Sequence, residues 1–173
     1  MLRNRRDRSS FWIVILSFYL GVSLPLWAKS DSLPMVKFVS LHQKSRLSIT
    51  VEVPRTKRDF EQGLMFRKTL AKQHGMLFSY PKPQTVRFWM RNTYIPLDIV
   101  FLDEQKKIVW IEESAIPLDE SPRGPNVQVQ HVVEIEAGLC KKYHIRLGDR
   151  VQFNQVLETM LPLVHKTFLT ENL

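Results

Sequence analysis

The residues best suited to chemistry stand close together in the stretch FWMRNTYIPLD, residues 88–98. It combines an aromatic platform, several side-chain donors and a carboxylate, which suits recognition of a small polar ligand, a glycan or a peptide. An arginine earlier in the chain can turn toward this stretch from the edge of a helix and bind a carboxylate through two hydrogen bonds. The candidate ligand-binding residues are Arg67, Trp89, Met90, Arg91, Asn92, Thr93 and Asp98.

The same residue types also suit a structural role. Phe88 and Trp89 are neighbours in an expected strand, so their side chains point to opposite faces and at least one belongs to the core. Asn92 and Pro96 are ordinary turn residues that can fix a bend without binding anything. A structural or protein-partner module is therefore an open alternative to ligand binding.

Motifs for nucleophilic catalysis are absent from the sequence. There is no G-x-S-x-G elbow, the single cysteine, Cys140, has no motif around it, and the five histidines show no pattern of roles. We expect Cys140 to be a small buried side chain. Because two carboxylates can hydrolyse a glycosidic bond, an envelope hydrolase that pairs Asp98 with Asp149 or Glu134 is the enzymatic alternative. The sequence favours a non-catalytic protein.

Metal-binding spacings are also missing. The chain has no H-x-x-x-H, no C-x-x-C and no carboxylate cluster, which argues against zinc and calcium sites. Met65, Met76 and Met90 with His74 offer soft ligands for Cu(I), but thioethers in apolar segments usually fill a core. We therefore predict no cofactor.

Short strands dominate the expected secondary structure. Alternating or uninterrupted apolar residues predict each strand, and a polar turn predicts a hairpin between two of them. The expected strands lie within residues 47–53, 75–78, 88–103, 108–111, 127–135 and 148–153. Because these strands do not alternate regularly with helices, the pattern favours a mostly β fold, a β-sandwich or distorted barrel, over a parallel α/β fold.

Two helices are expected beside the strands. Thr56 is a suitable N-cap, and Asp59 can reach back to the cap amide, which predicts an early inserted helix over residues 57–70. Residues 155–169 predict a short C-terminal helix that Pro162 interrupts. These two helices would frame the β region at its start and its end.

Five motifs follow one another in a fixed order: TKRDFEQGLMFR, GMLF, FWMRNTYIPLDIVF, EIEAG and the pair Gly148-Asp149. In this order, over about residues 45–153, the chain resembles the DUF192 (UPF0127) family. The resemblance implies a compact, mostly β domain, often exported, whose biochemical role is uncharacterised. A glycine usual in the hairpin turn is replaced here by Gln105-Lys106-Lys107, which we expect to alter only the turn.

The first 28 residues have the pattern of a signal peptide. Four arginines precede an apolar run from Phe11 to Leu26, and Ala28 offers a small residue at a cleavage point. Because the run approaches the ~20 residues that span a bilayer, an uncleaved inner-membrane anchor is the alternative. We expect an exported protein, periplasmic or extracellular.

Length and charge narrow the possible partners. Residues 29–173 suit one domain, with 29–44 as linker and first strand, 45–153 as the β domain and 154–173 as a helical tail. Without residues 1–28 the chain has 21 basic and 16 acidic side chains, a net charge of +5, and the basic residues are scattered. That distribution argues against nucleic acid. We predict a small polar ligand or envelope component as partner, with membrane contact only through an uncleaved N-terminal segment.

Overall fold

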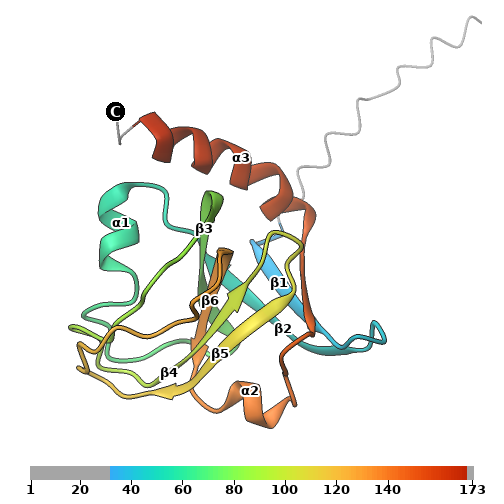
Figure 1. Cartoon of the computed structure of the whole chain (residues 1–173), viewed down its shortest axis with the longest axis horizontal. Coiled ribbons are helices and arrows are strands. Elements are labelled where there is room, and N and C mark those ends of the chain that lie inside the picture. The colour runs from blue at the N-terminus through green and yellow to red at the C-terminus, as the bar shows by residue number, and fades with distance from the viewer. Residues whose placement is uncertain (1–31, 171–173) are drawn as a thin grey trace, which may run out of the picture.

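A computed structural model describes residues 32–170, which form one seven-stranded mixed sheet and three helices (Figure 1). The strand order is β5-β4-β6-β3-β2-β1-β7, and β2 and β3 are the one parallel pair within this part of the chain. The elements are β1 (Met35–Val39), β2 (Ser45–Glu52), α1 (Lys57–Gln62), β3 (His74–Gln84), β4 (Leu97–Leu102), β5 (Ile108–Ala115), β6 (Val129–Glu136), α2 (Leu139–Lys142), β7 (Arg150–Phe153) and α3 (Gln155–Thr170).

The sheet curls until its two edge strands touch. Lys107 and Arg150 form a single antiparallel bridge, and the Ile108 N–H donates to the Asp149 carbonyl at 2.8 Å. Over residues 32–170 this contact does not extend into a ladder, so the sheet is not a closed barrel. The prediction of a mostly β fold with one early and one C-terminal helix is confirmed.

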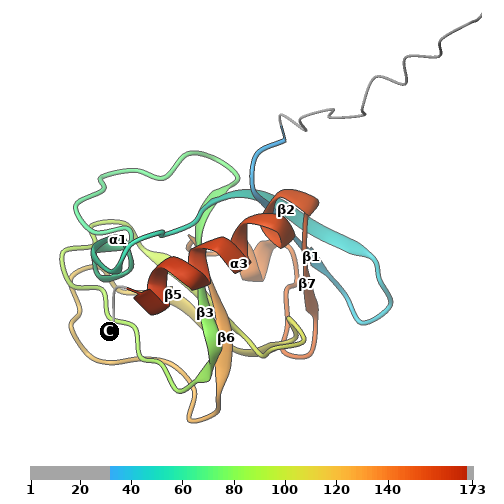
Figure 2. The same cartoon turned by 90° about the horizontal axis from the view of Figure 1, so that it is seen from above.

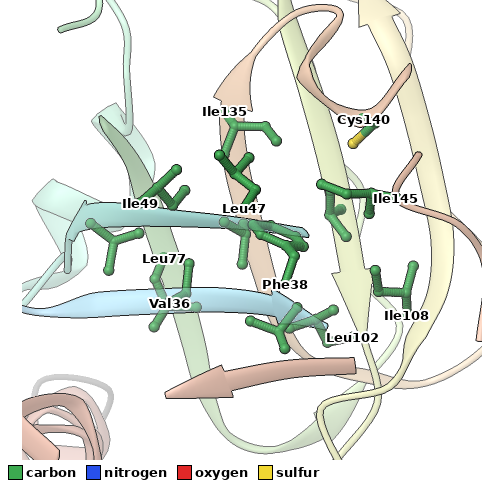
Figure 3. Packing of buried hydrophobic residues seen from close by; sticks show 14 of the residues in the cluster. Val36, Phe38, Leu47, Ile49, Leu77, Leu102, Ile108, Ile135, Cys140 and Ile145 are labelled. Carbon is green, nitrogen blue, oxygen red and sulfur yellow. The ribbon is translucent and has the colours of Figure 1, made fainter. Parts of the chain in front are cut away.

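One hydrophobic core fills the inside of the curl, because every strand contributes a buried side chain to it (Figure 3). Its largest members include Phe38, Ile49, Leu77, Leu102 and Ile135. Helix α3 covers one end of the curl and α2 lies at the other (Figure 1). Both helices take part in the same core, α3 through Leu157 and Leu161 and the α2 region through Cys140 and Ile145.

A second core lies on the outer face of the middle strands. Residues 57–70 and 86–90 fold over β3, β4 and β6 and bury apolar side chains against them. Its buried members include Leu64, Met76, Phe78, Val86, Met90, Ile99, Phe101 and Val132. The strands at the centre of the sheet are therefore covered on both faces, which explains why β4 is buried at all six positions.

Helix α1 begins as predicted and ends earlier. The Thr56 side chain accepts from the Asp59 N–H and the Asp59 carboxylate accepts from the Thr56 N–H, the predicted capping box. The helix ends at Gln62, because Gly63 adopts φ +49°. A Cβ atom at Gly63 would also lie 3.1 Å from the Phe78 ring, so the chain passes very close to the sheet here.

Helix α3 is continuous, which corrects the expected interruption at Pro162. Proline removes one helical hydrogen bond, but Leu157, Leu161 and Val164 bury one side of the helix on both sides of that point. Packing therefore holds the turn together. Figure 2 shows α3 lying across β3 and β6.

The stretch 88–103 differs from its expected form in its first half. Phe88 forms a single bridge with Arg123, residues 90–93 make a turn, and a regular strand begins only at Leu97. The expected hairpin between the second half and residues 108–111 is confirmed as β4 and β5. The expected export signal lies outside the described residues. Within residues 32–170, no helix has the length and apolar character needed to cross a bilayer.

Candidate functional site

A pocket of about 240 Å³ opens on the outer face of the sheet, between the α1 segment and the residues that lead into the 90–93 turn. Its walls come from α1 and the turn after it, from β3, from β6 and from residues 87–93. The side chains that give it its character are Phe60, Phe78, Tyr80, Phe88, Trp89, Thr93 and Glu134.

The aromatic walls form a connected set. Phe60 stands 5.7 Å from Phe78 and 5.6 Å from Tyr80, measured between ring centroids, and Phe78 stands 5.1 Å from Phe88. The Phe60–Phe78 and Phe78–Phe88 contacts are edge-to-face, the arrangement that aromatic quadrupoles favour. Trp89 completes the rim and is 47 % exposed. The pocket therefore has fixed aromatic sides and one accessible indole at its mouth.

Glu134 places a carboxyl group in the middle of this apolar surface. It lies on central strand β6, opposite Met76 on one neighbouring strand and Ile99 on the other, and it is 5 % exposed. Its Oε2 atom is buried and has no hydrogen-bond partner among the described residues. Burial raises the pKa of Glu134 to about 8, and the positive charge of Arg67 only partly opposes this rise. The carboxyl group is therefore largely protonated at neutral pH.

Arg67 lies beside the pocket and is already paired. Its two terminal nitrogens donate to Glu52 Oε1 and Oε2 at 2.5 and 2.7 Å, a bidentate ion pair. The pKa of Glu52 is lowered, first by this hydrogen bond, and the pKa of Arg67 is raised by it. Arg67 therefore acts on Glu134 through its charge, while its donors serve Glu52.

The corner residues divide between pocket and scaffold. Trp89 and Thr93 line the pocket, Met90 is fully buried in the outer core, and the Arg91 guanidinium lies 5.7 Å from the centroid of the Trp89 ring. Asn92 has φ +53°, and its carbonyl accepts from the Phe66 N–H at 2.7 Å. Asn92 thus forms the bend and ties it to the α1 segment, as the structural alternative expects.

Asp98 is not part of this corner. It faces the inner core, where its two carboxylate oxygens accept from the Ser114 and Cys140 N–H groups, each at 2.8 Å. These bonds join β5 and the start of α2 to β4. Of the two partners expected for Asp98 in the hydrolase alternative, Glu134 lies on the opposite, outer face of the sheet, and Asp149 is engaged by Arg46 and the Arg146 N–H.

A second polar cluster lies under α3. Ser79 Oγ is 2.9 Å from His131 Nδ1 and 2.8 Å from His165 Nε2, so the serine hydroxyl can donate to one ring and accept from the other. Burial, with a smaller contribution from Lys106, lowers the pKa of His131 to about 3. Ser79 and His131 are buried, which makes this cluster a tie between α3 and the sheet.

Cys140 is fully buried, as expected, and burial raises the pKa of its thiol. Within residues 32–170, no three His, Cys, Asp or Glu side chains are grouped as metal ligands. An apolar groove of about 670 Å³ between α3 and the start of α1 is larger than the pocket at Glu134. It is lined by residues such as Met160 and Leu163, with no carboxylate, histidine or cysteine, so it offers less chemistry.

Sequence reasoning missed the pocket's centre. It considered Glu134 only as a partner for Asp98 and did not connect it with Phe60 or Tyr80. One signal was available, because β6 reads VQHVVEIE, an apolar run too continuous for a strand with one wet face. A glutamate within such a run is expected to be buried.

The comparisons with known proteins identify the class. The model of the DUF192 family, described as an uncharacterized ACR, matches residues 39–153. The chain belongs to this family, which confirms the predicted resemblance. No curated protein matches the chain.

Two solved structures are similar to this chain. A protein from Sinorhizobium meliloti 1021, whose description suggests a transcription regulator, is 34 % identical with a TM-score of 0.66, over 69 % of this chain and 92 % of its own. A protein of unknown function from Novosphingobium aromaticivorans DSM 12444 is 35 % identical with a TM-score of 0.64, over 71 % of this chain and 88 % of its own. The biochemical role of the family is therefore open.

Proposed function

We propose that this chain is a non-catalytic binding module for a small polar ligand or an envelope component, and that the pocket at Glu134 is its binding site. The observation that carries the proposal is the buried Glu134 Oε2 without a partner. Buried polar atoms are nearly always hydrogen-bonded, so an orphaned carboxyl oxygen in a pocket wall indicates a missing partner. Among the described residues Arg46 Nε shares this status, but it lies 3.1 Å from Asp149 Oδ2 in an ion pair.

The pocket's size and lining support a small ligand. Its volume is below the ~300 to 1,000 Å³ of sites for drug-sized molecules, and apolar walls with few polar groups are usual for specific ligand sites. A hydrolase has less support, because Asp98 already accepts two backbone hydrogen bonds on the opposite face. We propose no nucleic-acid partner, because the basic side chains are scattered along the chain.

Ligand-observed NMR with a library of small polar fragments tests the proposal. Trp89→Ala should abolish or weaken the saturation transfer seen with wild type, because it removes the exposed wall of the pocket. Trp110→Ala is the matched control, since Trp110 is also exposed, at 41 %, and does not line this pocket. Fragments that bind both variants equally, or a library without any binder, would overturn the proposed site.

We also propose that the protein works outside the cytoplasm, on the basis of the basic and apolar pattern of residues 1–28. Fractionation of cells that make the full chain should place it in the periplasm or medium with the intact mass of a cleaved form. A full-length form in the membrane fraction would support the anchor alternative. A full-length form in the cytoplasm would contradict both.

A further inference from the structure

The proposed function does not say which class of ligand pairs with the buried carboxyl group of Glu134. Its strand neighbours on the outer face are Met76 and Ile99, and neither side chain carries a donor for the carboxyl group. A buried carboxyl that lacks a partner destabilises a fold, and such groups persist where they serve a site. A ligand that supplies positive charge would remove this cost.

The pocket walls suit a cation as well. The faces of aromatic rings carry negative potential and attract ammonium groups, most strongly when the site is shielded from water. Phe60, Phe78 and Phe88 supply fixed rings, and Trp89 supplies the indole at the rim. Together with one carboxyl group, these rings have the composition of a cage for an organic cation.

Among the described residues, the charged side chains around Glu134 do not supply a positively charged hydrogen-bond partner for its carboxyl group. Arg67 is held by both oxygens of Glu52. Arg87 lines the pocket, but its guanidinium donates to the Pro125 carbonyl and to Asn126 Oδ1. Glu61 adds a second carboxylate to the lining, and the pKa of Tyr80 is raised by burial and by Glu134, so the phenol is neutral. The lining thus carries two carboxyl groups, and its arginine, Arg87, is hydrogen-bonded to Pro125 and Asn126 and not to Glu134.

We infer that the ligand carries an ammonium group, which the aromatic walls enclose and Glu134 neutralises. This inference rests on the proposed binding function and names its ligand class. An anionic ligand would meet the Glu61 carboxylate and the negative potential of the ring faces. A neutral ligand could accept a hydrogen bond from protonated Glu134 but would gain no cation–π attraction from the ring faces.

Choline and its uncharged isostere 3,3-dimethyl-1-butanol separate these cases. The measurement is isothermal titration calorimetry, carried out on residues 29–173 and on the full chain. We expect choline to bind at least about tenfold more tightly than the alcohol. Glu134→Gln should remove this preference while leaving the fold intact by circular dichroism. Trp89→Ala should weaken binding of choline, and Trp110→Ala should not.

Proton release gives a second and independent readout. Choline has no ammonium proton to lose, so a proton released at pH 7 must come from the protein. Because the carboxyl group of the ligand-free protein is largely protonated, binding of choline should release nearly one proton per site. The release is measured by calorimetry in two buffers of different ionisation enthalpy. Glu134→Gln should release no proton.

Failure can be assigned to one proposal or the other. If library fragments bind at Trp89 but choline does not exceed the alcohol, or binds without proton release, the cation inference is wrong and the binding function stands. If choline preference survives in Glu134→Gln, Glu134 is not the counter-ion. If neither choline nor any fragment binds wild type, both proposals fail.

Discussion

Buried polar groups on the two faces of the sheet differ in their hydrogen bonding. On the inner face, Asp98 accepts two backbone hydrogen bonds and the Ser79 hydroxyl lies within 3 Å of two histidine nitrogens. On the outer face, Glu134 Oε2 has no partner within the described part of the chain. A satisfied polar group rigidifies a core, whereas an unsatisfied one costs stability. The inner groups therefore help to hold the fold, and the outer carboxyl group is the one to which we assign ligand binding.

The largest effect should come from breaking the inner face. Asp98→Ala removes the acceptor of the Ser114 and Cys140 N–H groups, the second of them buried, and leaves both donors without their partner. We expect the free energy of unfolding to fall by about 3 to 5 kcal/mol, measured by urea denaturation.

Asp103→Ala is the matched control for Asp98→Ala. Asp103 also accepts two backbone N–H groups, from Gln105 and Lys107 at 2.9 Å, but it sits in a partly exposed turn. Water can replace those bonds, so a loss of about 1 kcal/mol is expected. Equal losses for the two variants would contradict the structural role assigned to Asp98.

Glu134→Gln should act in the opposite direction. The folded pKa of about 8 exceeds the usual 4.5, so the folded state binds more protons between these values. The contribution of Glu134 to wild-type stability should therefore be fully present below about pH 4.5 and be lost as the pH rises through 8. Glutamine does not titrate, so the variant should gain about 3 kcal/mol over wild type at pH 8 and little at pH 4, by urea denaturation at each pH. A variant less stable than wild type at pH 8 would make Glu134 a structural residue.

His131, on the inner face, should make stability change with pH in the opposite direction. The folded pKa of His131, about 3, lies below the usual 6.5, so the unfolded chain binds more protons between these values. Stability should fall as the pH drops through 6.5 toward 3. His131→Gln should flatten this acid limb by about 2 kcal/mol between pH 7 and pH 4. If the acid limb is the same in wild type and variant, protonation of His131 does not limit acid stability.

Local features of the fold could be predicted from the sequence. The capping box of Thr56 and Asp59 and the β4–β5 hairpin depend on residues near one another in the chain, and both are present. The end of α1 could not be predicted from the sequence, because it depends on how close Gly63 comes to Phe78, a residue on another element. The continuity of α3 through Pro162 likewise depends on tertiary packing, which outweighs local propensity.

The candidate site could be predicted only in part for the same reason. Two of the candidate ligand-binding residues, Trp89 and Thr93, line the pocket, and both belong to one local motif. Asp98 shares that motif but points to the other face, since successive residues of a strand alternate. Glu134 and Phe60 are far from it in sequence. The sheet order, which sets β6 beside β3, brings Glu134 to the pocket, and the packing of α1 against the outer core brings Phe60.

The smallest effect on stability should come from Trp89→Ala, and this makes it the sharpest probe of the outer face. The indole is about half exposed and has the Arg91 guanidinium over its ring, so its removal opens no cavity in either core. We expect a change below about 0.5 kcal/mol in the free energy of unfolding, similar to Trp110→Ala on β5. If Trp89→Ala leaves stability unchanged and abolishes ligand binding, Trp89 belongs to the binding site and not to the residues that hold the fold. A loss above about 2 kcal/mol would instead place Trp89 in the core, and the aromatic wall of the pocket would then be part of the fold's packing.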